Sequence, residues 1–238
     1  MKLSVPFFVL CIVGLQASAQ YFYTRNDSLL SAHQFAQVRQ NCQAELSAGG
    51  DSLESNYFLA LATLTQDSES DANFISVPNP YLEEFQRIYR AHVRALSMMH
   101  GDQMMLSDSR FVKLFYLIGL QHFARKDFRH AAEWMNLAKV SFKDVYDFNF
   151  YQGCSYLAIR ELDKAKDYFD IALRIKPNDP ATTYNMACLF SLQNDVDESV
   201  KWLRLALSLN PEYKKHISSD FDFNNIRSTK QFQDLLED

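Results

Sequence analysis

The side chains that can do chemistry are scattered along this 238-residue chain and do not form a known catalytic or metal-binding pattern. Its six histidines include no His-Glu-x-x-His pair and its four cysteines no Cys-x-x-Cys pair, so the strongest zinc signatures are absent. No Gly-x-Ser-x-Gly turn or glycine-rich phosphate loop occurs among its six glycines. We therefore predict a protein that is not an enzyme and has no catalytic residues, cofactor or metal.

One local cluster could hold a soft metal ion. Met98, Met99 and His100 are followed closely by Met104 and Met105, and thioether and imidazole ligands suit Cu(I). The structural interpretation is that these methionines fill irregular gaps in a core near two helix ends. Copper handling is therefore a third hypothesis for function, and metal analysis of the purified protein would test it.

The composition argues against nucleic acid as a partner and against a disulfide framework. Acidic and basic residues are interleaved with a net charge of −5, so no basic stripe exists to follow a phosphate backbone. Beyond the N-terminal segment the cysteines are Cys42, Cys154 and Cys188, an odd number. We expect Cys154 and Cys188 to be small buried side chains and not redox partners.

The first nineteen residues have the order of a secretory signal. Lys2 precedes an apolar run from Leu3 to Leu15, and small residues at 17–19 supply a cleavage site before Gln20. The run is shorter than the about 20 residues that a membrane-spanning helix needs. We predict a signal peptide over 1–19, export to the periplasm or cell envelope, and no transmembrane span after cleavage.

A repeat of thirty-four residues predicts the helices that form the second half of the chain. Four columns of small and apolar residues recur in phase: Gly119, Gly153 and Ala187; Ala131, Ala165 and Ser199; Met135, Phe169 and Leu203; Ala138, Ala172 and Ala206. A fixed period of this length is typical of stacked helix pairs, each packed only on its neighbours. Small residues let two helix axes approach to about 8–10 Å. The pattern predicts an all-α fold, an α-solenoid of antiparallel helix pairs.

These columns resemble the tetratricopeptide repeat, a helix-turn-helix unit of this length. The resemblance covers residues 112–213 as three units, with its best copy at 151–179. The last unit with its tail, 184–211 followed by 220–227 and 232–236, is similar to the end-of-group segment that terminates many bacterial repeat proteins, and 214–238 is expected to be a C-terminal capping segment. The resemblance to the repeat implies a protein or peptide partner bound on a concave face lined by the first helices. Some family members clamp a terminal carboxylate with Lys, Asn and Arg, but that clamp is missing, because its positions here are Tyr116, Leu120, Tyr151, Ala181 and Asn185.

The surface that the resemblance places on the concave face is aromatic and apolar instead. Its residues, which we predict to bind a partner, are Tyr116, Leu120, Phe123, Phe150, Leu157 and Tyr184. Such a surface either takes an apolar segment of a partner or is filled by the chain's own N-terminal helices. The sequence leaves both alternatives open.

Residues 20–111 are predicted to form diverged helical hairpins of the same solenoid. One helix is expected from Asn26 to Ser47, a second after an Asp51 cap, and a long third from Pro80 to Gly101.

The tail is expected to cap the last unit. Ser228 with Gln231 predicts a capping box for a short helix, beneath which Phe221, Phe223 and Ile226 should pack.

The leading hypothesis for function is a non-enzymatic scaffold or adaptor for proteins in the periplasm or cell envelope. The alternative is an accessory or regulatory subunit of an envelope hydrolase, because end-of-group segments also occur attached to enzymes.

Overall fold

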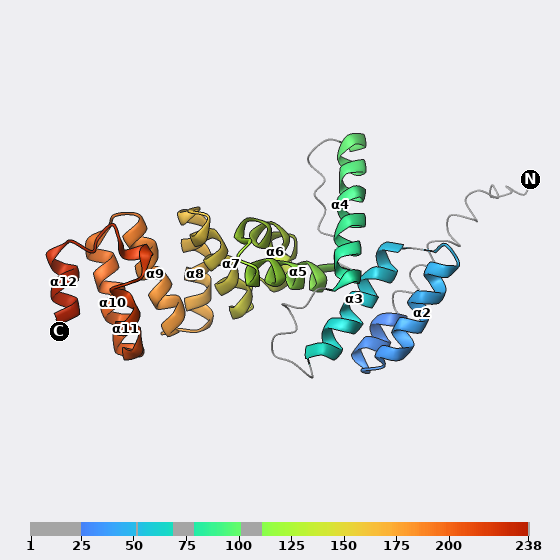
Figure 1. Cartoon of the computed structure of the whole chain (residues 1–238), viewed down its shortest axis with the longest axis horizontal. Coiled ribbons are helices and arrows are strands. Elements are labelled where there is room, and N and C mark those ends of the chain that lie inside the picture. The colour runs from blue at the N-terminus through green and yellow to red at the C-terminus, as the bar shows by residue number, and fades with distance from the viewer. Residues whose placement is uncertain (1–24, 51, 69–78, 101–110, 238) are drawn as a thin grey trace, which may run out of the picture. The chain divides into compact units, whose positions relative to one another are not determined.

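The computed structural model describes residues 25–50, 52–68, 79–100 and 111–237 (Figure 1). Every regular element within these ranges is a helix, which confirms the all-α prediction. In this described part, no helix is both long and apolar enough to cross a bilayer. The predicted signal peptide and the side chains of the Met98–Met105 cluster lie outside it. The chain divides into two compact units between Leu114 and Phe115.

The first unit contains a helix over 25–31, then α2 (Phe35–Ser47), α3 (Ser52–Ser68) and α4 (Pro80–His100). The prediction of one helix from Asn26 to Ser47 is wrong, because the chain turns at His33, whose φ is 56°. The Gln34 N–H donates to the carbonyl oxygen of Leu29 at 2.9 Å and closes this turn. Residues 25–47 are thus a helical hairpin.

The turn at His33 is the same as the turns within the hairpins of the second unit. A positive φ recurs thirty-four residues apart at Lys126 (61°), Arg160 (64°) and Asn194 (63°). The closing hydrogen bond also recurs, with the N–H of Asp127 donating to the carbonyl oxygen of His122 at 2.9 Å. A left-handed residue commonly ends a helix, and glycine usually supplies it. None of these four turns has glycine at the left-handed position, so the sequence contained no indication of the turn at His33.

The core of the first unit is aromatic. Tyr57 of α3, Phe85 of α4 and Phe111 are all buried. The Phe111 ring centroid lies 5.1 Å from that of Tyr57 and 5.4 Å from that of Phe85. Edge and tilted contacts of this kind hold α3 and α4 together.

The second unit begins at Phe115, within the first turn of α5. Its three helical hairpins are α5 (Val112–Ala124) with α6 (Phe128–Phe142), α7 (Tyr146–Ala158) with α8 (Leu162–Ile175), and α9 (Pro180–Leu192) with α10 (Val196–Leu209). The predicted small residues lie where paired helices cross. A Cβ added at Gly153 would lie 2.5 Å from Cε1 of Phe169, and one at Gly119 would overlap Met135. In the first two pairs the helices therefore approach closely at a position where only glycine leaves room, whereas Ala187 occupies this position in the third pair.

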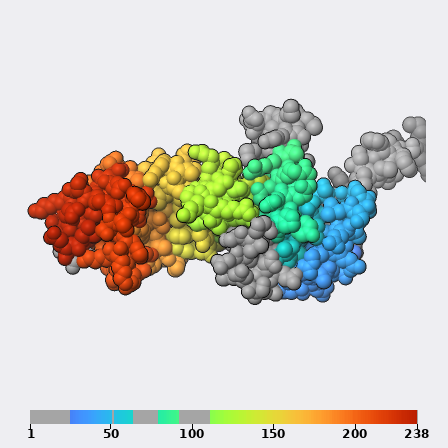
Figure 2. Space-filling view, in the orientation of Figure 1, coloured from blue at the N-terminus to red at the C-terminus, as the bar shows by residue number. Residues whose placement is uncertain are grey.

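The tail comprises a 3-10 turn (Pro211–Tyr213), α11 (Lys214–Ile217), a second 3-10 turn (Phe221–Phe223) and α12 (Lys230–Glu237). It forms the C-terminal end of the second unit, drawn in red in Figure 2. Its buried side chains, Ile217, Phe223, Ile226, Phe232 and Leu235, share one hydrophobic core with Met186, Leu189 and Leu203 of the last hairpin.

Two details of the tail differ from the prediction. Phe221 does not pack beneath α12 but is 82% exposed, because it lies in a short 3-10 turn in which Phe223 faces the core. The helix also begins later than expected, at Lys230, and its first described backbone bond runs from the Gln233 N–H to the Thr229 carbonyl oxygen. The Gln231 amide donates instead to the Asp197 carboxylate of α10 at 3.0 Å.

Candidate functional site

The six residues predicted to bind a partner lie in different surroundings. Leu157 of α7 is only 4% exposed and belongs to the hydrophobic core, so it has little surface left for a partner. Tyr116 and Leu120 of α5 are half-buried. The Tyr116 ring packs 4.9 Å from that of Phe142 and 5.7 Å from that of Phe148, which joins the first hairpin to the second.

Phe123 and Phe150 are brought together through a residue of α7. The Tyr151 ring lies 5.0 Å from Phe123 of α5 and 5.5 Å from Phe150, and Phe150 stacks on Tyr146 at 5.8 Å. We call these four residues, Phe123, Tyr146, Phe150 and Tyr151, the aromatic row. All four side chains are partly exposed. The row is a chain of ring contacts built on the first helices of two neighbouring hairpins.

Tyr184 of α9 holds the tail. Its hydroxyl donates to the Asp220 carboxylate at 2.6 Å, and its ring contacts those of Tyr213 at 4.8 Å and Phe223 at 5.6 Å. Burial and then the hydrogen bond to Asp220 raise the pKa of Tyr184 far above its ordinary value. This side chain therefore has a packing role whether or not it also contacts a partner.

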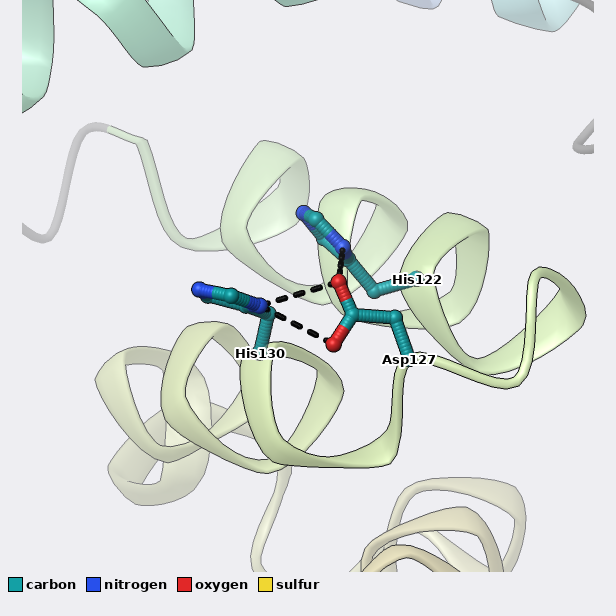
Figure 3. A group of neighbouring side chains, drawn as sticks. All are labelled: His122, Asp127 and His130. Atoms are coloured by element: carbon teal, nitrogen blue, oxygen red, sulfur yellow. Dashed lines mark hydrogen bonds and ion pairs between the residues drawn. The ribbon is translucent and has the colours of Figure 1, made fainter.

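A cluster of His122, Asp127 and His130 was not singled out by the sequence analysis. His122 lies on α5, Asp127 in the turn and His130 on α6, and both imidazoles point at the carboxylate (Figure 3). Nδ1 of His122 lies 3.0 Å from Asp127 Oδ2, and Nδ1 of His130 lies 2.9 Å from both carboxylate oxygens. Burial raises the pKa of Asp127, but the hydrogen bonds from His130 and His122 outweigh it, so the pKa lies below its ordinary value.

Comparison with known proteins identifies the last hairpin. The family model described as tetratricopeptide repeat matches residues 182–213. These residues form a tetratricopeptide repeat. Among curated proteins, none matches the chain.

Solved structures of MamA share the fold of this repeat protein. One, named MamA AMB-1, has a TM-score of 0.51 at 16% identity over 80% of this chain and 97% of that chain. A second crystal form of it gives 0.51 at 15% identity, over 82% of this chain and 93% of that chain. At such identity the likeness shows the fold alone, an α-solenoid of helix pairs, which confirms the predicted architecture.

Polar links join successive repeats beside the aromatic row. The Tyr146 hydroxyl donates to the Asp179 carboxylate at 2.5 Å, across the junction of α7 and α9. Asp179 also accepts from the Thr182 N–H at 2.9 Å and lies 2.8 Å from the ammonium of Lys176. Burial raises the pKa of this carboxyl, but the hydrogen bonds from Lys176, Tyr146 and Thr182 bring it down to about 2. The carboxylate thus stays charged at neutral pH and fixes the start of α9.

The cysteines of the repeats are free. Cys188 is 2% exposed and Cys154 is partly buried. Burial raises the pKa of the Cys154 thiol to about 12 and that of Cys188 well above its ordinary value. Because the thiolate is the reactive form, both side chains behave as apolar packing residues.

Proposed function

We propose that this chain is a non-enzymatic scaffold, exported to the periplasm or cell envelope, that binds a protein partner on the first helices of its tetratricopeptide repeats. The observation that carries the proposal is the aromatic row. Aromatic side chains supply large contact area with few rotatable bonds, and they dominate binding energy at many protein interfaces. Four of them lie partly exposed on two neighbouring first helices.

The proposed partner segment is apolar and not a charged chain terminus. The row offers ring faces and edges, with Tyr116 and Leu120 on α5 as further half-buried surface. The residue types that would clamp a terminal carboxylate do not stand at the corresponding positions. Burying an apolar side chain against the rings is worth about 25 cal/mol per Å² of apolar surface removed from water.

A pull-down from an envelope extract tests the binding surface. The double variant Phe123→Ala with Phe150→Ala should lose its captured partner while keeping its helical circular dichroism. Phe221→Ala is the matched control, because it removes an aromatic ring that is 82% exposed elsewhere in the same unit. Equal capture by the folded double variant and the parent would contradict the proposal. Capture of an envelope hydrolase would support the accessory-subunit alternative.

The proposed location is tested separately. Lys2, the apolar run and the small residues before Gln20 support export. N-terminal sequencing of the protein from an envelope fraction should find a chain that begins at Gln20, whereas an intact Met1 in the cytoplasmic fraction would exclude this compartment.

A further inference from the structure

Three possible metal ligands meet at one point on the surface of the hairpin formed by α5 and α6: His122, Asp127 and His130. One ligand atom from each lies within 4.8 Å of the others. The side chains of His122, Asp127 and His130 are 16%, 41% and 43% exposed, so an ion in solution can reach them. The two helices and the turn between them each contribute one ligand (Figure 3).

The orientation of Asp127 is unlike that of Asp195, which occupies the equivalent position two repeats further along the chain. Asp195 precedes α10 as Asp127 precedes α6, and its carboxylate accepts from the Glu198 N–H at 3.1 Å, as an N-cap residue usually does. In the described first hairpin Asp127 makes no such capping bond, although it is also the N-cap residue. Its two oxygens face the imidazoles instead.

The equivalent three positions in the hairpin formed by α7 and α8 show which side chains are sufficient to form this turn. They are occupied by Tyr156, Glu161 and Lys164. The Lys164 ammonium lies 3.4 Å from the Glu161 carboxylate and 5.3 Å from the centre of the Tyr156 ring. An ordinary surface ion pair is therefore enough to build this turn, and two imidazoles on one carboxylate are not required for the hairpin.

Two imidazole nitrogens and a carboxylate oxygen are a ligand set suited to zinc. Zinc binds such atoms at about 2.0–2.2 Å, so neighbouring ligands of a tetrahedral ion lie about 3.3 Å apart. The 2.9–3.0 Å between each Nδ1 and the carboxylate would have to open slightly, and the two imidazoles, whose ligand atoms lie within 4.8 Å of one another, would have to approach until those atoms are about 3.3 Å apart. We propose that His122, Asp127 and His130 bind one divalent transition-metal ion of the zinc class, through Nδ1 of each histidine and the carboxylate. The ion joins α5 to α6, and three protein ligands leave its fourth position to water.

Calorimetric titration of the metal-free full chain with zinc chloride tests the site. The parent should bind one ion per chain, and zinc should raise its melting temperature because it binds the folded state. His130→Ala and the nearly isosteric Asp127→Asn should each weaken binding by at least about tenfold, since even outer residues of a zinc site contribute that much. His216→Ala is the matched control, because His216 is an exposed histidine on α11, and it should bind like the parent.

The competing location is the Met98–Met105 cluster, which contains His100. His100→Ala should leave zinc binding unchanged. The proposal is overturned if the parent binds no zinc, if a folded His130→Ala or Asp127→Asn variant binds as tightly as the parent, or if His100→Ala abolishes binding. Circular dichroism of the metal-free variants identifies which of them are folded, and Asp127→Asn keeps the shape of the turn even if an alanine does not.

Discussion

Gly153 lies where α7 crosses α8, and the Phe169 ring occupies the space that a side chain there would need. Gly153→Leu should therefore destabilise the protein by about 1–3 kcal/mol, the usual cost of overfilling a packed core. Ala158→Leu is the matched control, because it makes a similar enlargement at an exposed end of the same helix and should change stability by less than about 0.5 kcal/mol. Urea unfolding of the two variants checks this prediction, and equal midpoints would contradict the close crossing.

The surroundings of a single residue could be predicted where the same contact recurs in every repeat. They could not be predicted where the contact occurs in one hairpin only. The Gly119 and Gly153 column could be assigned because each copy repeats the same helix crossing. Leu157 was expected on the partner-binding face but lies in the core, where α9 and the tail add packing that one repeat does not reveal. The cluster around Asp127 matches no known spacing motif, because two helices and a turn bring it together.

At the scale of helices and turns, a residue with positive φ recurs in the turns of four helical hairpins, and it explains why the sequence did not predict the turn at His33. Glycine or proline would have marked the turn at His33, but the chain uses histidine there, and lysine, arginine and asparagine in the equivalent turns. The buried stripe of Phe35, Val38 and Cys42 runs along α2 alone. A helix was thus correctly expected over these residues, whereas its start could not be placed without the backbone.

Asp179 links two such elements, and its charge should make the array sensitive to acid. The carboxyl has a pKa of about 2 in the folded protein against an ordinary value of 3.8, which corresponds to about 2 kcal/mol of stabilisation at neutral pH. A carboxyl whose pKa is lowered by folding stabilises the folded state at pH values above the pKa of the unfolded chain. This contribution of Asp179 should therefore be complete above about pH 4 and disappear as the pH falls towards 2.

Asp179→Asn isolates that charge, because asparagine is an equally good N-cap. We expect the variant to be less stable than the parent at pH 7 by up to about 2 kcal/mol and the gap to close between pH 4 and pH 2. Asp144→Asn, at a side chain that is 86% exposed, is the control. Denaturant unfolding across this pH range measures both, and a gap that stays constant down to pH 2 would refute the role of the charge.

At the scale of the molecule, the fold class followed from the thirty-four-residue period, because a helix pair of that length can bury its apolar face only against another pair. The same principle explains the tail. The last pair has no following repeat, so α12 and the turns before it supply the missing apolar surface. The sequence indicated this cap but not which phenylalanine faces inward, since Phe221 and Phe223 are separated by a single residue.

The cap can be tested with two phenylalanines of the tail. Phe232 is fully buried against the last repeat, whereas Phe221 is 82% exposed. Phe232→Ala should cost about 3–5 kcal/mol, as large core truncations do, and should raise the fluorescence of a dye that binds exposed apolar surface. Phe221→Ala should leave stability within about 0.5 kcal/mol of the parent. Because each repeat is stabilised by its neighbour, loss of the cap should lower the melting temperature of the whole array and not only fray its end. Equal melting of the two variants would mean that α12 does not seal the solenoid.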